Sequence, residues 1–150
     1  MKARDIMHWN PTVVTPEEAV SHAAEHMRYE PDACIPVVED ATSRMLVGVI
    51  TARDLATRCM ARRHGGDCTV GDHMTPLPLH TVHLDDDIGT MLHMMHAAQI
   101  RRLPVISTGG VLLGMVTDEG VAEALATAEW ASHPFAPMGN GLLRTRAKPS

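Results

Sequence analysis

The chain has 150 residues and a formal net charge of -5, and 45% of its residues are hydrophobic but only 3% are aromatic. A chain of this length and composition can form a folded core without metals or disulfides, so a disordered chain and a disulfide scaffold are excluded. The acidic charge argues against nucleic acid and anionic membranes as partners. The few aromatic rings argue against a stacking platform for single-stranded nucleic acid. No apolar run approaches about 18 residues, so no membrane-spanning segment is predicted.

The N-terminal residues and the cysteines indicate a cytoplasmic protein. Met1–Asp5 runs directly into mixed polar sequence without the apolar region of a secretory signal. Cys34, Cys59 and Cys68 are odd in number and form no C-x-x-C pair, which favours free thiols in a reducing compartment.

The first half of the chain predicts alternating strands and helices. Thr12–Val14 is a short strand-like run, and Thr15–Glu18 predicts a helix start with Thr as N-cap and Pro at the first position. An apolar stripe at helical spacing follows, made of Val20, Ala23, Ala24 and Met27. Ile35–Val38 and Met45–Ile50 predict two strands, and Thr51–Asp54 opens a second helix.

The second half predicts the same order of elements after a glycine-containing linker. Asp85–Asp87 precede a helix, where the helix dipole favours acidic side chains. Leu103–Ile106 and Val111–Val116 predict strands. Two further stripes mark the helices, Ile88, Met91, Leu92 and Met95 in one, and Val121, Ala124, Leu125 and Ala128 in the other.

Three landmarks occur twice in the same order and at nearly constant separation. The pairs are Asp5-Ile6-Met7 with Asp72-His73-Met74, Cys34–Val38 with Arg102–Ile106, and Leu46–Thr51 with Leu112–Thr117. The chain is therefore predicted to be a tandem duplication of an α/β (α+β) unit, β-α-β-β-α, packed about a pseudo-twofold axis. A ligand cleft is expected where the two repeats meet.

The duplication predicts four segments. Residues 1–62 and 70–128 are the two repeats, and residues 63–69 are the linker between them. Residues 129–150 contain prolines, glycines and basic residues, which predicts a flexible basic tail.

These motifs resemble the CBS (cystathionine-β-synthase) domain pair, also called a Bateman module, over about residues 3–128. The resemblance is carried by Gly48-Val49-Ile50-Thr51-Ala52-Arg53-Asp54 and by the strands at Ile35–Val38 and Ile100–Val105. It implies an adenosine ligand such as AMP, ADP, ATP or S-adenosylmethionine, no required cofactor, and a homodimer.

The resemblance also implies roles for individual residues. It assigns the ribose to Thr51 and Asp54, the adenine pocket to Val13, Val14, Ile35 and Pro36, and the phosphate to Arg53, Arg101 and Arg102. The chemistry agrees, because a carboxylate can accept two hydroxyl hydrogen bonds and a helix start attracts phosphate. Thr-x-x-Asp is also an ordinary helix-capping pattern, and both roles are compatible.

The second copy of the motif departs from the first. Gly120 stands at the position that matches Asp54, and Asp118 and Glu119 place acid where phosphate would lie. We therefore expect one competent site and one degenerate site.

The expected function is a non-enzymatic regulatory module that binds an adenosine nucleotide between the repeats and acts in trans on an unknown protein partner. The alternative is a protein-interaction or dimerisation module with a vestigial site, which Gly120 favours. An enzyme is the third hypothesis, but the sequence offers no nucleophile–base pair for catalysis. The histidine pairs His22/His26 and His93/His96 lack cysteine or carboxylate companions, so no metal site is predicted.

Overall fold

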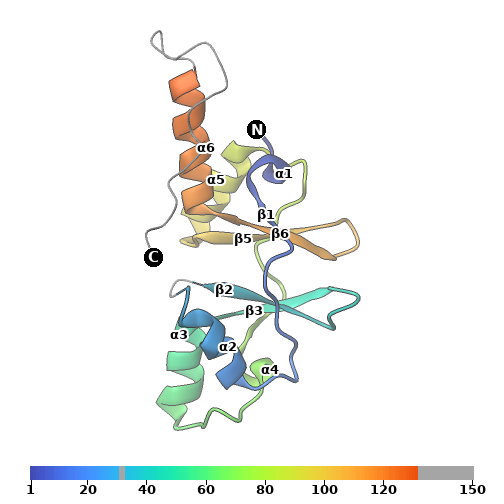
Figure 1. Cartoon of the computed structure of the whole chain (residues 1–150), viewed down its shortest axis with the longest axis vertical. Helices are drawn as coiled ribbons and strands as arrows, with labels where there is room; N and C mark the ends of the chain where they lie inside the picture. Colours follow the sequence, from blue (N-terminus) through green and yellow to red (C-terminus); the bar gives the residue numbers. More distant parts are fainter. Residues whose placement is uncertain (31–32, 132–150) are drawn as a thin grey trace.

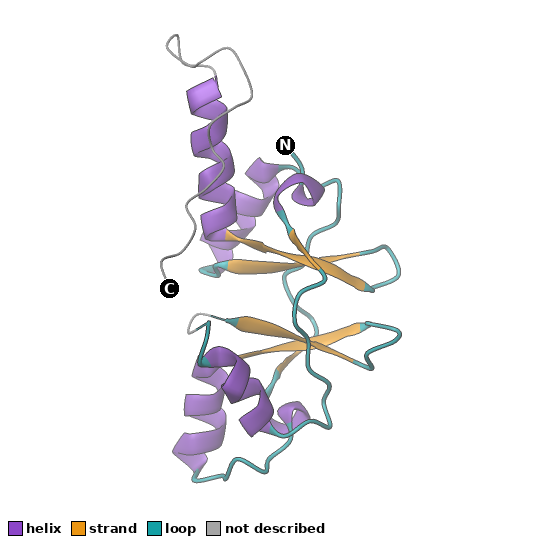
Figure 2. Cartoon of the chain, in the orientation of Figure 1, coloured by secondary structure: helices purple, strands orange, loops and turns teal. Residues whose placement is uncertain are grey.

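The computed structural model describes residues 1–30 and 33–131, and it contains two three-stranded antiparallel sheets that face each other. The helices cover the outer side of each sheet (Figures 1 and 2). The prediction of a mixed α/β fold made of two tandem units is confirmed. Residues 129–131 belong to the last helix, and the rest of the predicted tail lies outside the described residues.

The elements follow one another in the same order in both halves. The first half contains α1 (Ala3–Ile6), β1 (His8–Trp9), α2 (Val20–Met27), β2 (Cys34–Val38), β3 (Leu46–Thr51), α3 (Ala52–Asp54), the π-helical turn η1 (Leu55–Cys59) and the 3-10 turn η2 (Met60–Arg62). The second half contains α4 (Val70–His73), β4 (Thr75–Pro76), α5 (Ile88–Ala98), β5 (Arg102–Ile106), β6 (Leu112–Thr117) and α6 (Asp118–Ala131). No helix among the described residues is both long enough and apolar enough to cross a bilayer.

The two halves exchange their first elements. Strand β1 pairs with β6 in one sheet, and β4 pairs with β3 in the other. The short helices α1 and α4 are exchanged together with these strands. Ala3 of α1 is fully buried in the second core, and Val70 of α4 is fully buried in the first. Each folded unit is therefore completed by residues from the other sequence repeat.

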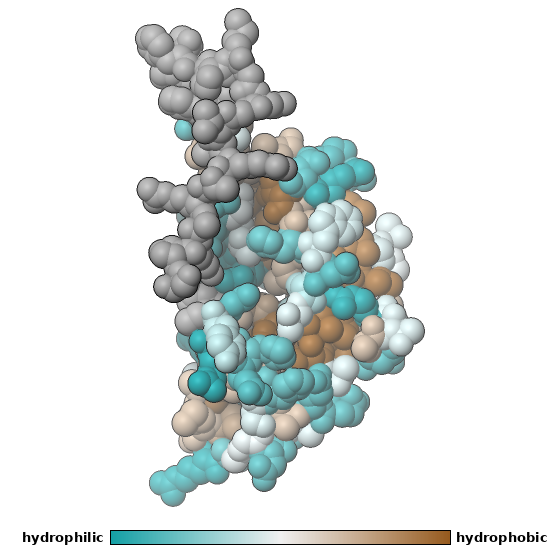
Figure 3. Space-filling model, viewed as in Figure 1, coloured by the Kyte–Doolittle hydropathy of each residue, from teal (hydrophilic) through white to brown (hydrophobic). Residues whose placement is uncertain are grey.

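Each sheet covers its own aliphatic core, and a third cluster joins the two units. Val37 and Ile50 are fully buried in the first core, and Leu103 and Val116 are fully buried in the second. The joining cluster contains Val38, Leu46 and Leu112. Figure 3 shows hydrophobic residues where the two halves of the molecule meet. The inter-repeat seam is thus closed by apolar packing over part of its length.

The predicted helix start at Thr15–Glu18 is wrong, because α2 begins at Val20 with Ala19 as its N-cap. The exchanged segment explains the difference. Glu18 O accepts a hydrogen bond from Val70 N at 2.8 Å, and Pro16 O accepts one from Gly71 N at 2.9 Å. These carbonyls bind the neighbouring chain segment, so they are not available to open a helix of their own.

Candidate functional site

The end of β3 and the start of α3 form a capping box. Asp54 N donates to Thr51 Oγ1 at 3.2 Å, and Thr51 N donates to Asp54 Oδ2 at 3.0 Å. The Thr51 hydroxyl also lies 3.1 Å from the same carboxylate oxygen. The capping role that the sequence allowed is therefore present, and it fixes the direction of both polar side chains.

Asp54 is a buried carboxylate with partners from both sequence repeats. Only 8% of the residue is exposed. Thr75 Oγ1, from the exchanged strand β4, donates to Oδ1 at 3.2 Å, and Arg58 Nε lies 3.7 Å from the same oxygen. Buried acids persist where such partners replace the lost water. The carboxylate is thus held in place before any ligand binds.

A cavity of about 460 Å³ opens beside this carboxylate, at the seam between the repeats. Its size is within the range of about 300–1,000 Å³ that small-molecule sites occupy. Its lining comes from three places: Val49, Thr51 and Asp54 of the first repeat, Pro78, Leu79 and His80 after β4, and Ile100, Arg101 and Arg102 at β5. The cavity combines apolar walls with an acid at one side and basic residues at another.

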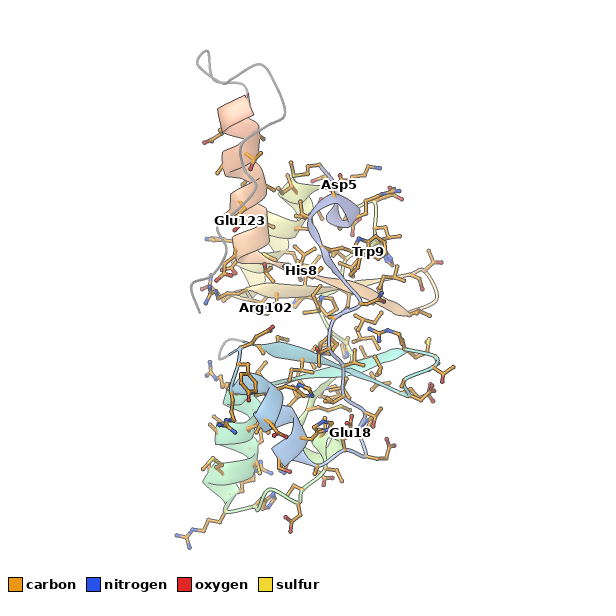
Figure 4. The ribbon with its side chains drawn as sticks, in the orientation of Figure 1. Asp5, His8, Trp9, Glu18, Arg102 and Glu123 are labelled. Atoms are coloured by element: carbon orange, nitrogen blue, oxygen red, sulfur yellow. The ribbon has the colours of Figure 1, made fainter. Side chains whose placement is uncertain are left out.

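The cavity brings together four of the residues that the sequence nominated. Thr51 and Asp54 line it from the first repeat, and Arg101 and Arg102 line it from the second. Figure 4 shows Arg102 on β5, at the seam between the two units. Arg53 follows Thr51 closely in sequence, but it is exposed and does not line the cavity.

The residues nominated for the adenine pocket lie elsewhere. Val14 is fully buried in the first core, and Val13 packs against the joining cluster. Ile35 and Pro36 line a second cavity. Because β4 pairs with β3, residues 78–80 of the second repeat occupy the place beside Thr51 that the sequence assigned to the first repeat.

Sequence reasoning nominated four of the lining residues and missed the rest, which include Cys34, Val49, Thr75, Ile100 and Pro104. The largest group that it missed is Pro78, Leu79 and His80. They follow the second Asp-x-Met landmark closely, as Pro11 and Thr12 follow the first. The landmark was visible in the sequence, but the exchange of the strand between the repeats was not.

Arg101 already has an acidic partner in the second repeat. Its Nε donates to Asp118 Oδ2 at 2.7 Å, and this hydrogen bond is the main reason why the pKa of Asp118 is lowered. Glu119 Oε1 lies 3.7 Å from Nη2 of the same arginine. A phosphate at Arg101 would therefore have to compete with two carboxylates.

The second cavity, of about 710 Å³, opens beside the degenerate copy of the motif, from which Met115, Thr117 and Glu119 line it. Gly120 N still donates to Thr117 Oγ1, at 3.0 Å, so the cap survives without the carboxylate. Glu119 lines this cavity, and Arg102 and Cys34 line both cavities. The two sites are equivalent in backbone and different in charge.

Cys34 lines both cavities, and its thiol is held largely in the protonated form. Burial raises its pKa to about 11. A thiol becomes a good nucleophile only as the thiolate, which this pKa disfavours at neutral pH.

The exchanged strands and the two facing sheets define a protein built of two tandem α/β repeats, with cavities at the seam between them. The profile of the CBS domain family matches residues 3–61 and 70–127. The chain belongs to the CBS domain family, as its motifs indicated.

Two curated relatives illustrate the range of proteins that contain this pair. The chain is 31% identical to uncharacterized protein YlbB of Bacillus subtilis (strain 168), over 93% of either chain. It is 30% identical to inosine-5'-monophosphate dehydrogenase of Streptococcus pyogenes serotype M3 over 84% of its own length. The chain spans only 24% of that dehydrogenase.

Two solved structures share the architecture. Hypoxic Response Protein I, crystallised with two coordinated zinc ions, is 31% identical with a TM-score of 0.72, and the match covers 82% of this chain and 98% of that one. CBSX2, crystallised in complex with AMP, is 28% identical with a TM-score of 0.72, over 85% of this chain and 98% of that one.

Proposed function

We propose that this protein is a non-enzymatic regulatory module that binds an adenosine nucleotide of the AMP, ADP or ATP type and acts in trans on a protein partner. The observation that carries the proposal is the buried Asp54 carboxylate, oriented by Thr51 and facing a seam cavity of about 460 Å³. The AMP complex of CBSX2 supports an adenosine ligand for a pair of this architecture.

The proposed ligand would use each wall of the cavity differently. The ribose hydroxyls would donate to Asp54, which is an acceptor-only group when ionised. The adenine ring would lie against the apolar surfaces of Pro78, Leu79 and Ile100, and the phosphate would lie towards Arg102 and Arg101. In this arrangement Val13, Val14, Ile35, Pro36 and Arg53 do not contact the ligand.

We propose one nucleotide per chain. The second cavity lacks the ribose carboxylate because Gly120 stands in the place of Asp54, and Glu119 adds negative charge to its lining. A nucleotide in that cavity would find no carboxylate for its ribose, and Glu119 would repel a phosphate placed near Arg102.

Isothermal titration calorimetry of the chain with AMP, ADP, ATP and S-adenosylmethionine tests the proposal. One of these ligands should bind at one equivalent per chain, and Asp54→Ala should weaken it by about 10- to 100-fold, because a hydrogen bond to a charged group contributes about 1.5–3 kcal/mol.

Asp87→Ala is the matched control. The Asp87 carboxylate caps α5 by accepting from Thr90 N at 2.8 Å, and this residue is not among those that line the cavity beside Asp54. The control should lose a cap and keep the ligand. Absence of binding for all four ligands would reject the nucleotide proposal and favour the protein-interaction module.

A further inference from the structure

Three metal-ligating side chains converge where the first repeat ends and the linker begins. Cys59 ends η1, Cys68 lies in the linker, and His73 ends α4. Their ligand atoms all lie within 4.8 Å of one another. The group is separate from the nucleotide cavity, and none of its members lines either seam cavity.

Two of these three side chains are buried. Cys59 is 4% exposed and His73 is 3% exposed, while Cys68 is half-buried. The Cys59 thiol lies 3.8 Å from His64 O and 3.7 Å from Gly65 O, and the His73 ring has His64 as its partner. Thiol and imidazole groups gathered this closely at a buried position are the side chains that bind Zn²⁺ in proteins.

A fourth candidate ligand lies beside the group. His64 Nδ1 is 3.4 Å from His73 Nε2. Two nitrogen ligands of a tetrahedral zinc ion, each about 2.0–2.1 Å from the metal, lie about 3.3–3.4 Å apart. The two imidazoles thus already have the separation of a ligand pair, and His64 belongs to the exposed linker, which can adjust.

The spacing along the chain also suits a metal. Cys59, His64, Cys68 and His73 alternate within one short segment, so a bound ion would tie the linker to the last turn of the first repeat. Two sulfur and two nitrogen ligands form the Cys₂His₂ set that prefers Zn²⁺ or a similar borderline-soft ion over Mg²⁺ or Ca²⁺.

We propose that Cys59, Cys68 and His73, with His64 as the fourth ligand, bind one Zn²⁺-like divalent cation. Each cysteine ligates as the thiolate and releases its proton to the solvent, and both imidazoles ligate in the neutral form. Metal uptake should therefore release one proton per cysteine that is protonated beforehand, and titrations in two buffers of different ionisation enthalpy can count these protons.

The test uses the full chain, held reduced and freed of metal, and titrated with Zn²⁺ and with Co²⁺. We expect one equivalent to bind, a rise in the thermal midpoint, and a cobalt spectrum with tetrahedral d–d bands and a thiolate charge-transfer band. Cys68→Ser should abolish the charge-transfer contribution of that thiolate and weaken Zn²⁺ by more than the 10- to 100-fold typical of a lost supporting residue.

Matched variants separate the site from other ligands and from misfolding. Cys34→Ser removes the thiol outside the group and should keep the metal, as should His93→Ala on α5. Cys68→Ser without metal should show the far-UV circular dichroism of the metal-free wild type, since Cys68 is only half-buried. His64→Ala should replace the tetrahedral cobalt spectrum with one of lower intensity and higher coordination.

Three results would overturn the proposal. They are a wild-type chain that binds no metal, a Cys68→Ser variant that binds as tightly as the wild type, and an intact mass showing a Cys59–Cys68 disulfide in metal-free protein that Zn²⁺ does not prevent. Unchanged cobalt bands in His64→Ala would remove His64 from the ligand set.

Discussion

Two glycines allow the exchanged strands to approach their sheets. A Cβ on Gly48 would lie 2.7 Å from Thr75 O and 2.8 Å from Met74 Sδ. A Cβ on Gly114 would meet the equivalent atoms, 2.7 Å from His8 O and 2.8 Å from Met7 Sδ. The glycine of each motif is therefore needed for the close approach of the other repeat's backbone, independently of any ligand.

Gly48→Ala should lower the free energy of unfolding by about 1–3 kcal/mol, as overpacked side chains do. The added methyl would push β4 away from β3, and Thr75 would lose its hydrogen bond with Asp54, so nucleotide affinity should fall as well. Urea unfolding followed by circular dichroism measures the first effect, and calorimetry measures the second.

Gly109→Ala is the control for this substitution, since the nearest atom to its Cβ would be Ser107 Oγ at 3.8 Å, an ordinary contact. Equal midpoints for Gly48→Ala and Gly109→Ala would show that β4 does not need the close approach.

At single positions, the sequence predicted local structure where a short residue pattern is typical of one backbone geometry. The Thr51-x-x-Asp54 spacing predicted a capped turn, and the structure contains both of its hydrogen bonds. Arg53 belongs to the same turn, but the turn directs it to solvent. The motif alone therefore predicts the turn, but the position of the sheet is needed to predict which side chains of the turn face the cavity.

At the scale of elements, each core depends on a segment from the other repeat. The first core includes the fully buried Val70, and Val20 N donates to Cys68 O at 2.7 Å. The second core includes the fully buried Ala3, whose N donates to Asp86 O at 2.9 Å. A boundary drawn at the sequence repeat therefore cuts through both cores.

A fragment whose ends follow the boundaries of a folded unit should be more stable than a fragment whose ends follow the sequence repeat. Residues 10–77 retain α4 and β4, whereas residues 1–62 lack both and expose α1 without its core. We expect cooperative urea unfolding for 10–77 and a non-cooperative curve for 1–62, because loss of Val70 alone removes about 1.5–3 kcal/mol from a small unit.

Fluorescence of an extrinsic apolar dye should report the same order, with more dye bound to 1–62. Cooperative unfolding of 1–62 with none for 10–77 would mean that the exchange is not needed for stability.

The same exchange limits what the sequence could predict about the site. The order of strands and helices follows from local patterns, which the duplication repeats. Which strand lies beside β3 is a long-range choice, and nothing local in Thr75 or Pro76 distinguishes pairing with the first sheet from pairing with the second. The ribose side of the proposed site was therefore accessible to sequence reasoning, and Pro78–His80 were not.

For the whole molecule, the helical surface of the second unit is a candidate surface for self-association. Helices α5 and α6 lie side by side on the outer face of their sheet (Figure 1). Leu92 on α5 is 40% exposed and Leu125 on α6 is 37% exposed. Both leucines belong to the helical stripes that the sequence assigned to packing, and the chain's own core leaves them partly uncovered. We propose that they lie in the interface of a homodimer.

Light scattering coupled to size-exclusion chromatography should give twice the 16.3 kDa mass of one chain. The double variant Leu92→Glu/Leu125→Glu should elute as the monomer, because two carboxylates per chain would have to be desolvated at the interface. Trp9→Glu is the matched control: Trp9 is 57% exposed but lies on β1, away from α6 (Figure 4). A monomeric wild type would contradict the dimer. A dimer that survives the double variant but is lost in Trp9→Glu would place the interface elsewhere on the molecule.

The dimer and the ligand site can be tested separately. Because both seam cavities lie within one chain, nucleotide binding should persist in the monomeric variant.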